Sequence, residues 1–191
     1  MNKGRLEAFS DGVLAIIITI MVLELKVPHE ADFSALKPIL PVFLSYVLSF
    51  IYIGIYWNNH HHLLQATKKV NGKILWANLH LLFWLSIVPF TTAWMGENHF
   101  APHPIALYGI NLLFAAISYT ILQSLIIKHH GKEYILAEAI GKDWKGKVSL
   151  GLYIVGIIAS FFAEWIAGTC FVVVALIWLI PDKRIEAKIT D

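Results

Sequence analysis

The stretch RLEAFSDGVLAIIITIMVLEL, residues 5–25, places a carboxylate at the start of a long apolar run. In a membrane-spanning helix, Asp11 would stand about one turn inside the span. A charge at that depth costs several kcal/mol unless it faces protein or water, so an intramembrane acid marks either an ion pathway or a structural contact. The comparable acids are Glu24, near the far end of the same run, and Glu164, between two later runs.

The composition assigns the chain to the integral membrane proteins. Of the 191 residues, 58% are hydrophobic, and the mean hydropathy of +0.65 is far above that of soluble proteins. About 20 apolar residues, rising 1.5 Å each, cross the hydrocarbon core. We therefore expect one all-α membrane domain, residues 1–191, with six transmembrane helices. The expected spans are residues 8–27, 36–57, 74–95, 104–127, 148–163 and 165–180.

The last two spans are short and nearly contiguous, with Glu164 at their junction. This pattern predicts a tight helical hairpin whose turn lies near one membrane face. Gly151 and Gly156 in the fifth span favour close helix packing.

The distribution of Lys and Arg predicts the orientation. Cytoplasmic loops carry an excess of these residues, and here most of them fall in segments that six spans leave on one side. Only Lys26 and Lys37 fall on the other side. Both termini should therefore be cytoplasmic, in the plasma or inner cell membrane, and the number of spans should be even. The residues on the cytoplasmic side are Lys3, Arg5, Lys68, Lys69, Lys73, Lys128, Lys132, Lys142, Lys145, Lys147, Lys183, Arg184 and Lys188.

Further features restrict the class of protein. The first run carries Asp11 and Glu24, so we do not expect a cleaved signal peptide. Basic residues in short loops beside spans indicate contact with membrane lipids and no nucleic-acid partner. The single Cys170 has no metal-site spacing, so we expect it to be a packing residue. Residues 134–137 fit either a helix on the membrane surface or a plain structured loop.

The helical period divides the first span into two faces. At 100° per residue, Asp11 lies roughly 140° away from Ile16. If the Ile16 side faced a symmetry axis, Asp11 would point back into its own subunit. The second and third spans offer it the partners Trp57, Asn58, His61, Asn78 and His80. The residues within about 60° of Ile16 are Gly12, Thr19, Ile20 and Leu23.

These residues form a pattern that resembles the TMEM175 family, most closely its single-repeat prokaryotic members. The resemblance covers the whole chain in length and six-span layout, and its specific part is the first half. The pattern consists of Arg5, Phe9, Ser10, Asp11 and Gly12 opening the first span, Trp57 and His61 ending the second, and Asn78, Pro89 and Phe90 in the third.

The resemblance implies a potassium-preferring cation channel, a homotetramer in which the first helix of each subunit lines the pore. Ile16 and Leu23 would match the apolar constriction, and Thr19 would match the hydroxyl position between them. K⁺ would permeate near Thr19, and no cofactor or metal site is implied. The sequence has no Thr-Val-Gly-Tyr-Gly loop, so we expect no filter of that type and only modest selectivity. The residues that would hold the pore helix are Arg5, Phe9, Ser10, Asp11, Trp57, His61 and Asn78.

Other interpretations compete with each of these assignments. An Ile/Thr/Leu stripe is by itself more typical of a packing surface than of a pore, and Thr19 fits a hydroxyl bonded to the carbonyl four residues back. For Asp11 a role in a structural contact is favoured over a role as an ion site, because its side chain would point away from the proposed axis. Glu24 either attracts cations or is simply solvated, with Lys26 close enough to neutralise it.

The histidines do not form a convincing metal site. His60, His61 and His62 are adjacent, so on a helix they point about 100° apart. His99 and His103 have helical spacing, but the prolines around His103 oppose a helix there. We instead expect His61 to be the partner of Asp11, which would make channel assembly sensitive to pH.

An enzyme is not expected, because the sequence contains no nucleophile elbow, zinc-protease motif or phosphate loop. A secondary ion transporter is the nearer alternative, and it would predict inverted repeats and broken helices at the midplane. The remaining alternative is a membrane scaffold that conducts no ions.

Overall fold

The computed structural model describes residues 3–130 and 143–179, which form six α-helices and one short 3-10 helix, without strands. The all-α class predicted from the sequence is therefore confirmed. In chain order the elements are α1 (Lys3–Leu23), η1 (Phe33–Ile39), α2 (Leu40–Ala66), α3 (Gly72–Glu97), α4 (Pro102–His130), α6 (Trp144–Ala159) and α7 (Glu164–Leu179). Residues 134–137 lie outside the described part.

Within residues 3–130 and 143–179, four segments are long and apolar enough to cross a membrane: Lys3–Leu23, Phe33–Ala66, Gly72–Glu97 and Pro102–His130. The last two helices, α6 and α7, have 16 residues each. At 1.5 Å per residue such a helix is about 24 Å long, shorter than the roughly 30 Å of the hydrocarbon core. The fifth and sixth spans expected from the sequence correspond to these two helices. Helix α6 begins at Trp144, four residues before the expected start at residue 148.

The second span differs most from the expected residues 36–57. Pro38 and Pro41 lack the backbone N–H that an α-helix needs beyond its first turn, and residues 33–39 form the 3-10 helix η1 instead. At its other end α2 continues past Trp57 to Ala66. The polar residues there stay helical because they have partners, as when Asn59 Nδ2 donates to the Ile55 carbonyl at 2.8 Å.

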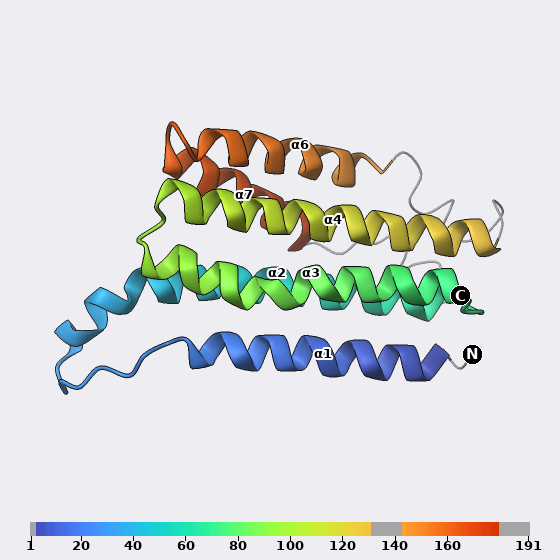
Figure 1. The fold of residues 1–191 in the computed structure, drawn as a ribbon, viewed down its shortest axis with the longest axis horizontal. Coiled ribbons are helices and arrows are strands. Elements are labelled where there is room, and N and C mark those ends of the chain that lie inside the picture. The colour runs from blue at the N-terminus through green and yellow to red at the C-terminus, as the bar shows by residue number, and fades with distance from the viewer. Residues whose placement is uncertain (1–2, 131–142, 180–191) are drawn as a thin grey trace.

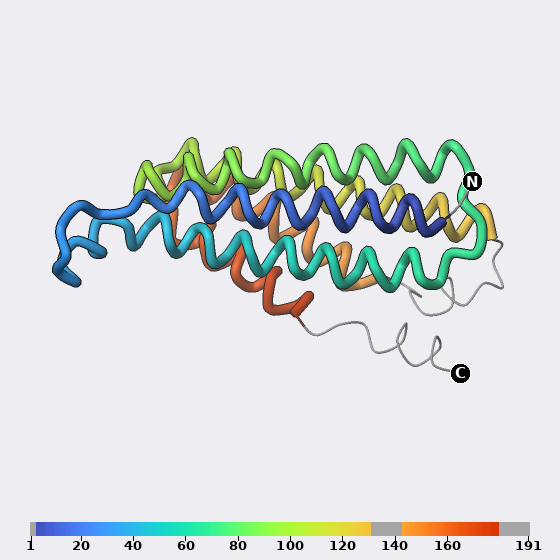
Figure 2. Tube along the Cα trace, turned by 90° about the horizontal axis from the view of Figure 1, so that it is seen from below, coloured from blue at the N-terminus to red at the C-terminus, as the bar shows by residue number. Residues whose placement is uncertain are grey.

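The helices run along a common axis, with α1 at one edge of the bundle (Figure 1). Seen from that edge, α1 lies between α2 and α3 (Figure 2), and these are the helices that it packs against. Helix α4 packs against both α3 and α6, and α7 packs against α6 and α2. One side of α1 is therefore covered by its own chain, and the opposite side is uncovered within the described residues.

Buried polar contacts fix the helices behind α1. The Ser49 hydroxyl of α2 is 2.7 Å from Thr92 Oγ1 of α3 and 3.0 Å from Tyr108 Oη of α4. Residues 160–163 turn the chain between α6 and α7, and Glu164 opens α7. The Phe171 ring lies where a Cβ at Gly109 or Gly156 would stand, so these glycines let α4 and α6 approach α7 closely.

Candidate functional site

The side chains that α1 buries recur every three or four residues. This spacing places them on one helical face, where they meet α2 and α3. Four of them are apolar, and the fifth is the Ser10 hydroxyl. They are Leu6, Ser10, Leu14, Ile17 and Met21.

The opposite face of α1 is apolar and uncovered. Ile16 is 58% exposed and Leu23 is 79% exposed, and Thr19 and Ile20 are exposed between them. We call these four residues the outward face. An apolar stripe with no cover in its own chain indicates contact with lipid or with another subunit.

Thr19 is the only hydroxyl on the outward face, and its hydrogen is directed to its own helix. Thr19 Oγ1 donates to the Ile16 carbonyl at 2.9 Å, one residue nearer than the carbonyl considered from the sequence. A hydroxyl that donates its hydrogen keeps acceptor lone pairs on oxygen. Thr19 can therefore present a partial negative charge on the outward side of α1.

A groove lies between α3 and the part of α1 around Ile16 and Ile20. Its α1 side includes Ile16, Ile20 and Glu24, and its α3 side includes Phe90 and Trp94. The groove has a volume of about 590 Å³ and is largely apolar. Ile16 and Ile20 therefore border both the groove and the uncovered side of the helix.

Asp11 is held by a residue of its own chain. Trp57 Nε1 donates to Asp11 Oδ1 at 3.1 Å, and the Trp57 ring stacks on His61 at a centroid distance of 6.1 Å and an interplanar angle of 24°. The donor to Asp11 is thus the indole N–H of Trp57, and no hydrogen bond joins Asp11 to His61, the partner expected from the sequence, among the described residues. Both Asp11 and His61 are exposed in a single subunit.

A second, buried contact joins α1 to two helices. Ser10 Oγ donates to the Leu6 carbonyl at 2.8 Å and accepts from Asn78 Nδ2 at 3.0 Å. Asn78 Oδ1 lies 2.6 Å from His60 Nε2. Ser10, Asn78 and His60 are all buried, so α1, α2 and α3 share one polar network.

The remaining predicted residues of the pore-helix attachment, Arg5 and Phe9, are exposed on α1. The structure therefore brings together Ser10 with Asn78, Asp11 with Trp57, and Trp57 with His61, and it leaves Arg5 and Phe9 at the surface of the single subunit. Near Arg5, Lys3 Nζ donates to the Gln65 carbonyl at 3.0 Å and ties the start of α1 to the end of α2.

Sequence reasoning missed His60 and Lys3. The family resemblance points to His61, but its neighbour His60 points about 100° away and reaches Asn78 of α3. The signal for His60 lay in Asn78, since a buried amide needs a polar partner on a neighbouring helix.

An ion pair ties the opposite end of α1 to α3. Lys26 Nζ is 2.6 Å from Glu97 Oε1, and both side chains are exposed. The hydrogen bond that Lys26 donates to Glu97 and the charge of Glu97 raise the pKa of the Lys26 ammonium, with a smaller contribution from Glu24. Lys26 is therefore engaged mainly with Glu97.

Among the described residues, no group of three or more His, Cys, Asp or Glu could hold a metal ion. His103 lies in α4 and contacts Phe161 edge-on at 5.6 Å. His99 lies in the preceding turn with a φ of 51°.

Comparisons with known proteins point to one family. Residues 5–89 match the family described as "Endosomal/lysosomal potassium channel TMEM175". The chain is 61% identical over 191 residues to a potassium channel of Chryseobacterium sp. (strain P1-3), covering 100% of both chains. It is 34% identical over 190 residues to a potassium channel of Chamaesiphon minutus, covering 90% of this chain and 91% of that one.

A solved structure has the same fold. It is the crystal structure of a lysosomal potassium-selective channel TMEM175 homolog from Chamaesiphon minutus, with a TM-score of 0.78 and 30% identity. The match covers 92% of this chain and 95% of that one. Residues 5–89, which match the family, contain the outward face and the contacts of Ser10 and Asp11.

Proposed function

This chain belongs to the TMEM175 family of potassium channels, and we propose that it conducts K⁺ passively through a pore lined by α1 of each subunit in a homotetramer. It is a multi-pass membrane protein with apolar helices. The observation that carries the proposal is the outward face of α1. This face is apolar, uncovered by its own chain and interrupted by one hydroxyl.

Four outward faces around an axis give the pore its barrier. Rings of Ile16 and Leu23 exclude water when they are close together, and an ion cannot cross a dry apolar ring. A small outward movement of α1 widens the rings and lets the pore fill with water. Conduction is therefore governed by the position of α1.

Thr19 gives the pore its preference for K⁺. Its oxygen is available to a passing cation because its hydrogen is bonded to the Ile16 carbonyl. K⁺ sheds its hydration shell more easily than Na⁺, so a narrow passage with few polar groups favours K⁺. Discrimination is modest, since the sequence has no Thr-Val-Gly-Tyr-Gly loop to replace the whole hydration shell.

The polar contacts of α1 set the position of the rings. Asp11 acts as a structural acceptor for Trp57, and Ser10 joins α1 to Asn78. His61 supports the Trp57 ring from its other side. Arg5 and Phe9, exposed near the same end of α1, complete the attachment through neighbouring subunits of the tetramer.

Both termini lie in the cytoplasm, and the protein resides in the plasma or inner cell membrane. The excess of Lys and Arg on one side of six spans supports this orientation. Asp11, Ser10 and Trp57 then lie toward the cytoplasmic side, and Glu24, Lys26 and Glu97 toward the outer side.

Ion flux from liposomes that contain the purified protein tests the proposal. Gradients of K⁺ or Na⁺ are imposed in turn on wild type and on Thr19→Ala. The expected result is a faster K⁺ flux in wild type and a reduced K⁺ preference in Thr19→Ala. Folded protein that passes neither ion under any gradient would contradict the proposal.

A further inference from the structure

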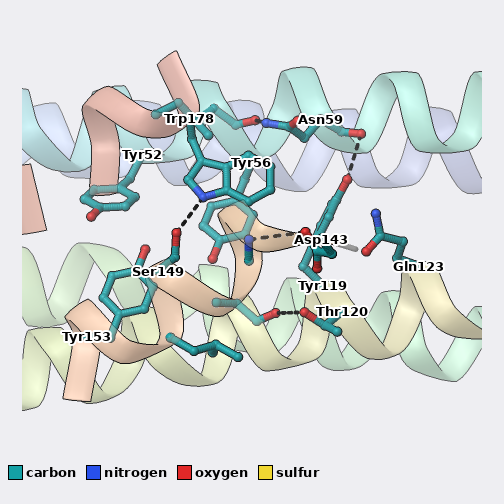
Figure 3. Close-up of a pocket in the computed structure, with 14 residues that line it drawn as sticks. Tyr52, Tyr56, Asn59, Tyr119, Thr120, Gln123, Asp143, Ser149, Tyr153 and Trp178 are labelled. Atoms are coloured by element: carbon teal, nitrogen blue, oxygen red, sulfur yellow. Dashed lines mark hydrogen bonds between the residues drawn. The ribbon is translucent and has the colours of Figure 1, made fainter. Parts of the chain in front are cut away.

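A cavity lies between α2, α4, α6 and α7, away from α1 (Figure 3). Its volume is about 40 Å³, which accommodates roughly three water molecules. The cavity belongs to one subunit and includes none of the outward-face residues, so it is independent of the proposed pore.

Aromatic rings from all four helices line this cavity. The Tyr56 and Tyr119 rings have centroids 6.3 Å apart at an interplanar angle of 66°, and the Tyr52 and Tyr153 rings are 6.5 Å apart at 41°. Trp178 lines it from α7. Several ring faces around a small space attract cations through the ring quadrupole.

Several hydrogens of the polar groups in the lining are directed to the protein. Tyr52 Oη donates to the Phe171 carbonyl at 2.6 Å, and Trp178 Nε1 donates to Ser149 Oγ at 2.9 Å. Ser149 Oγ in turn donates to the Lys145 carbonyl at 2.8 Å. The Tyr52 and Ser149 oxygens keep acceptor lone pairs, so this part of the lining favours a cation over an anion.

A carboxylate gives the cavity its charge preference. Asp143 is half-buried in the lining and caps α6, with Oδ1 accepting from Gly146 N at 3.2 Å. Its φ of 40° is a left-handed conformation, which Asp and Asn adopt more readily than most residues.

The ammonium of Lys145 lies beside the cavity, over the Trp178 ring. Its Nζ lies 5.9 Å from the centroid of the Trp178 ring. This ammonium would repel a cation bound in the cavity. The negative charge of the Asp143 carboxylate is therefore needed to offset that repulsion.

We propose that this cavity binds a small quaternary ammonium group, held by the aromatic rings of Tyr56 and Tyr119 and by the charge of Asp143. A quaternary ammonium presents its positive charge on a methyl-covered surface, which suits aromatic walls. Such a group occurs on soluble compounds and on choline headgroups of lipids, and the experiment below distinguishes these sources.

Binding of radiolabelled tetramethylammonium to the full chain in maltoside detergent tests this proposal, with neutral tert-butanol as the uncharged comparison. Asp143→Asn keeps the cap and the tolerance of left-handed φ while it removes the charge. We expect it to weaken tetramethylammonium binding about tenfold and to leave tert-butanol unaffected. Glu24→Gln, a carboxylate beside the outward face, should bind like wild type.

Two variants at Tyr119 separate the contribution of its ring from that of its hydroxyl. They also test the proposal if Asp143→Asn does not fold. Tyr119→Phe should retain binding, and Tyr119→Leu should weaken it severalfold. Equal binding by Asp143→Asn and wild type, or weakening by Glu24→Gln alone, would overturn the proposal.

Nanodiscs then identify the source of the ammonium. Lower tetramethylammonium affinity in phosphatidylcholine than in phosphatidylglycerol assigns the cavity to the lipid headgroup. Equal affinity in both assigns it to a soluble ligand. Both outcomes require that wild type binds tetramethylammonium, and no binding by folded wild type in detergent or in phosphatidylglycerol would contradict the proposal.

Discussion

Asn78 of α3 donates a hydrogen bond of 3.0 Å to Ser10 of α1, and both side chains are fully buried. The other end of the same amide meets His60 of α2 at 2.6 Å. One side chain thus connects three helices inside the bundle. The position of α1 depends on this polar contact as well as on apolar packing.

Removing the Ser10 hydroxyl tests that contact. Ser10→Ala leaves the Asn78 N–H buried without its acceptor, which costs about 1–3 kcal/mol. We expect a clear fall in Tm measured in detergent. Ser86→Ala is the matched control, because the exposed Ser86 hydroxyl bonds only the Phe83 carbonyl of its own helix. Equal Tm values for the two variants would show that the Ser10 contact adds nothing.

The indole N–H of Trp57 should act together with Asp11. Trp57→Phe keeps a ring beside His61 but removes the donor to Asp11. Asp11→Asn, by removing the charge, weakens the same hydrogen bond. A double-mutant cycle on Tm should therefore give a coupling of about 0.5–1.5 kcal/mol. Strictly additive effects would mean that the two side chains do not interact.

The sequence predicted the helices well where hydropathy and helical period agree. In the first span, the period grouped Ile16 with Thr19, Ile20 and Leu23, and all four are exposed in the structure. The buried positions, such as Leu14 and Ile17, lie on a different face of the helix. Amphipathic spacing is a local property, so it can be read without knowledge of the partners.

Contacts between helices were harder to predict. The end of α2 was placed at Trp57 because the next residues are polar, but His60 finds Asn78 and keeps the helix intact to Ala66. Similarly, Asp143 and Trp178 meet around one cavity only because α6 and α7 fold back onto α2 and α4. Such long-range neighbours leave no periodic signal in the sequence.

Leu23 should be accessible from the pore. In a Cys170→Ser background, Leu23→Cys should lose most of its K⁺ flux on treatment with a charged thiol reagent, because a charge at an apolar ring obstructs ions. Ile154→Cys on α6, also exposed in the single subunit, is the control and should keep its flux. Equal inhibition of both variants would argue against a pore along α1.

The Lys26–Glu97 pair predicts an effect of pH. Glu97 raises the pKa of Lys26 above its usual 10.5, so the contribution of the pair is present below that pH and is lost as pH rises through the higher folded value. Lys26→Met should therefore have a slightly lower Tm than wild type near pH 8, and the difference should disappear as pH rises through the raised pKa of Lys26.

The effect on Tm should be small and weakened by salt, because both side chains are exposed. Lys37→Met serves as the control for loss of a lysine on the same side of the protein. A difference between Lys26→Met and wild type that grows with pH would contradict the assignment.

The most direct test of the central claim, that α1 lines the pore, is K⁺ flux through Ile16→Asn in liposomes. Ile154→Asn is the matched control, since Ile154 is 50% exposed and Ile16 is 58% exposed but only Ile16 lies on the outward face. A polar side chain should wet an apolar ring, so we predict a severalfold greater leak in Ile16→Asn and wild-type flux in Ile154→Asn. Wild-type flux in Ile16→Asn, or an equal leak in both variants, would contradict a pore along α1.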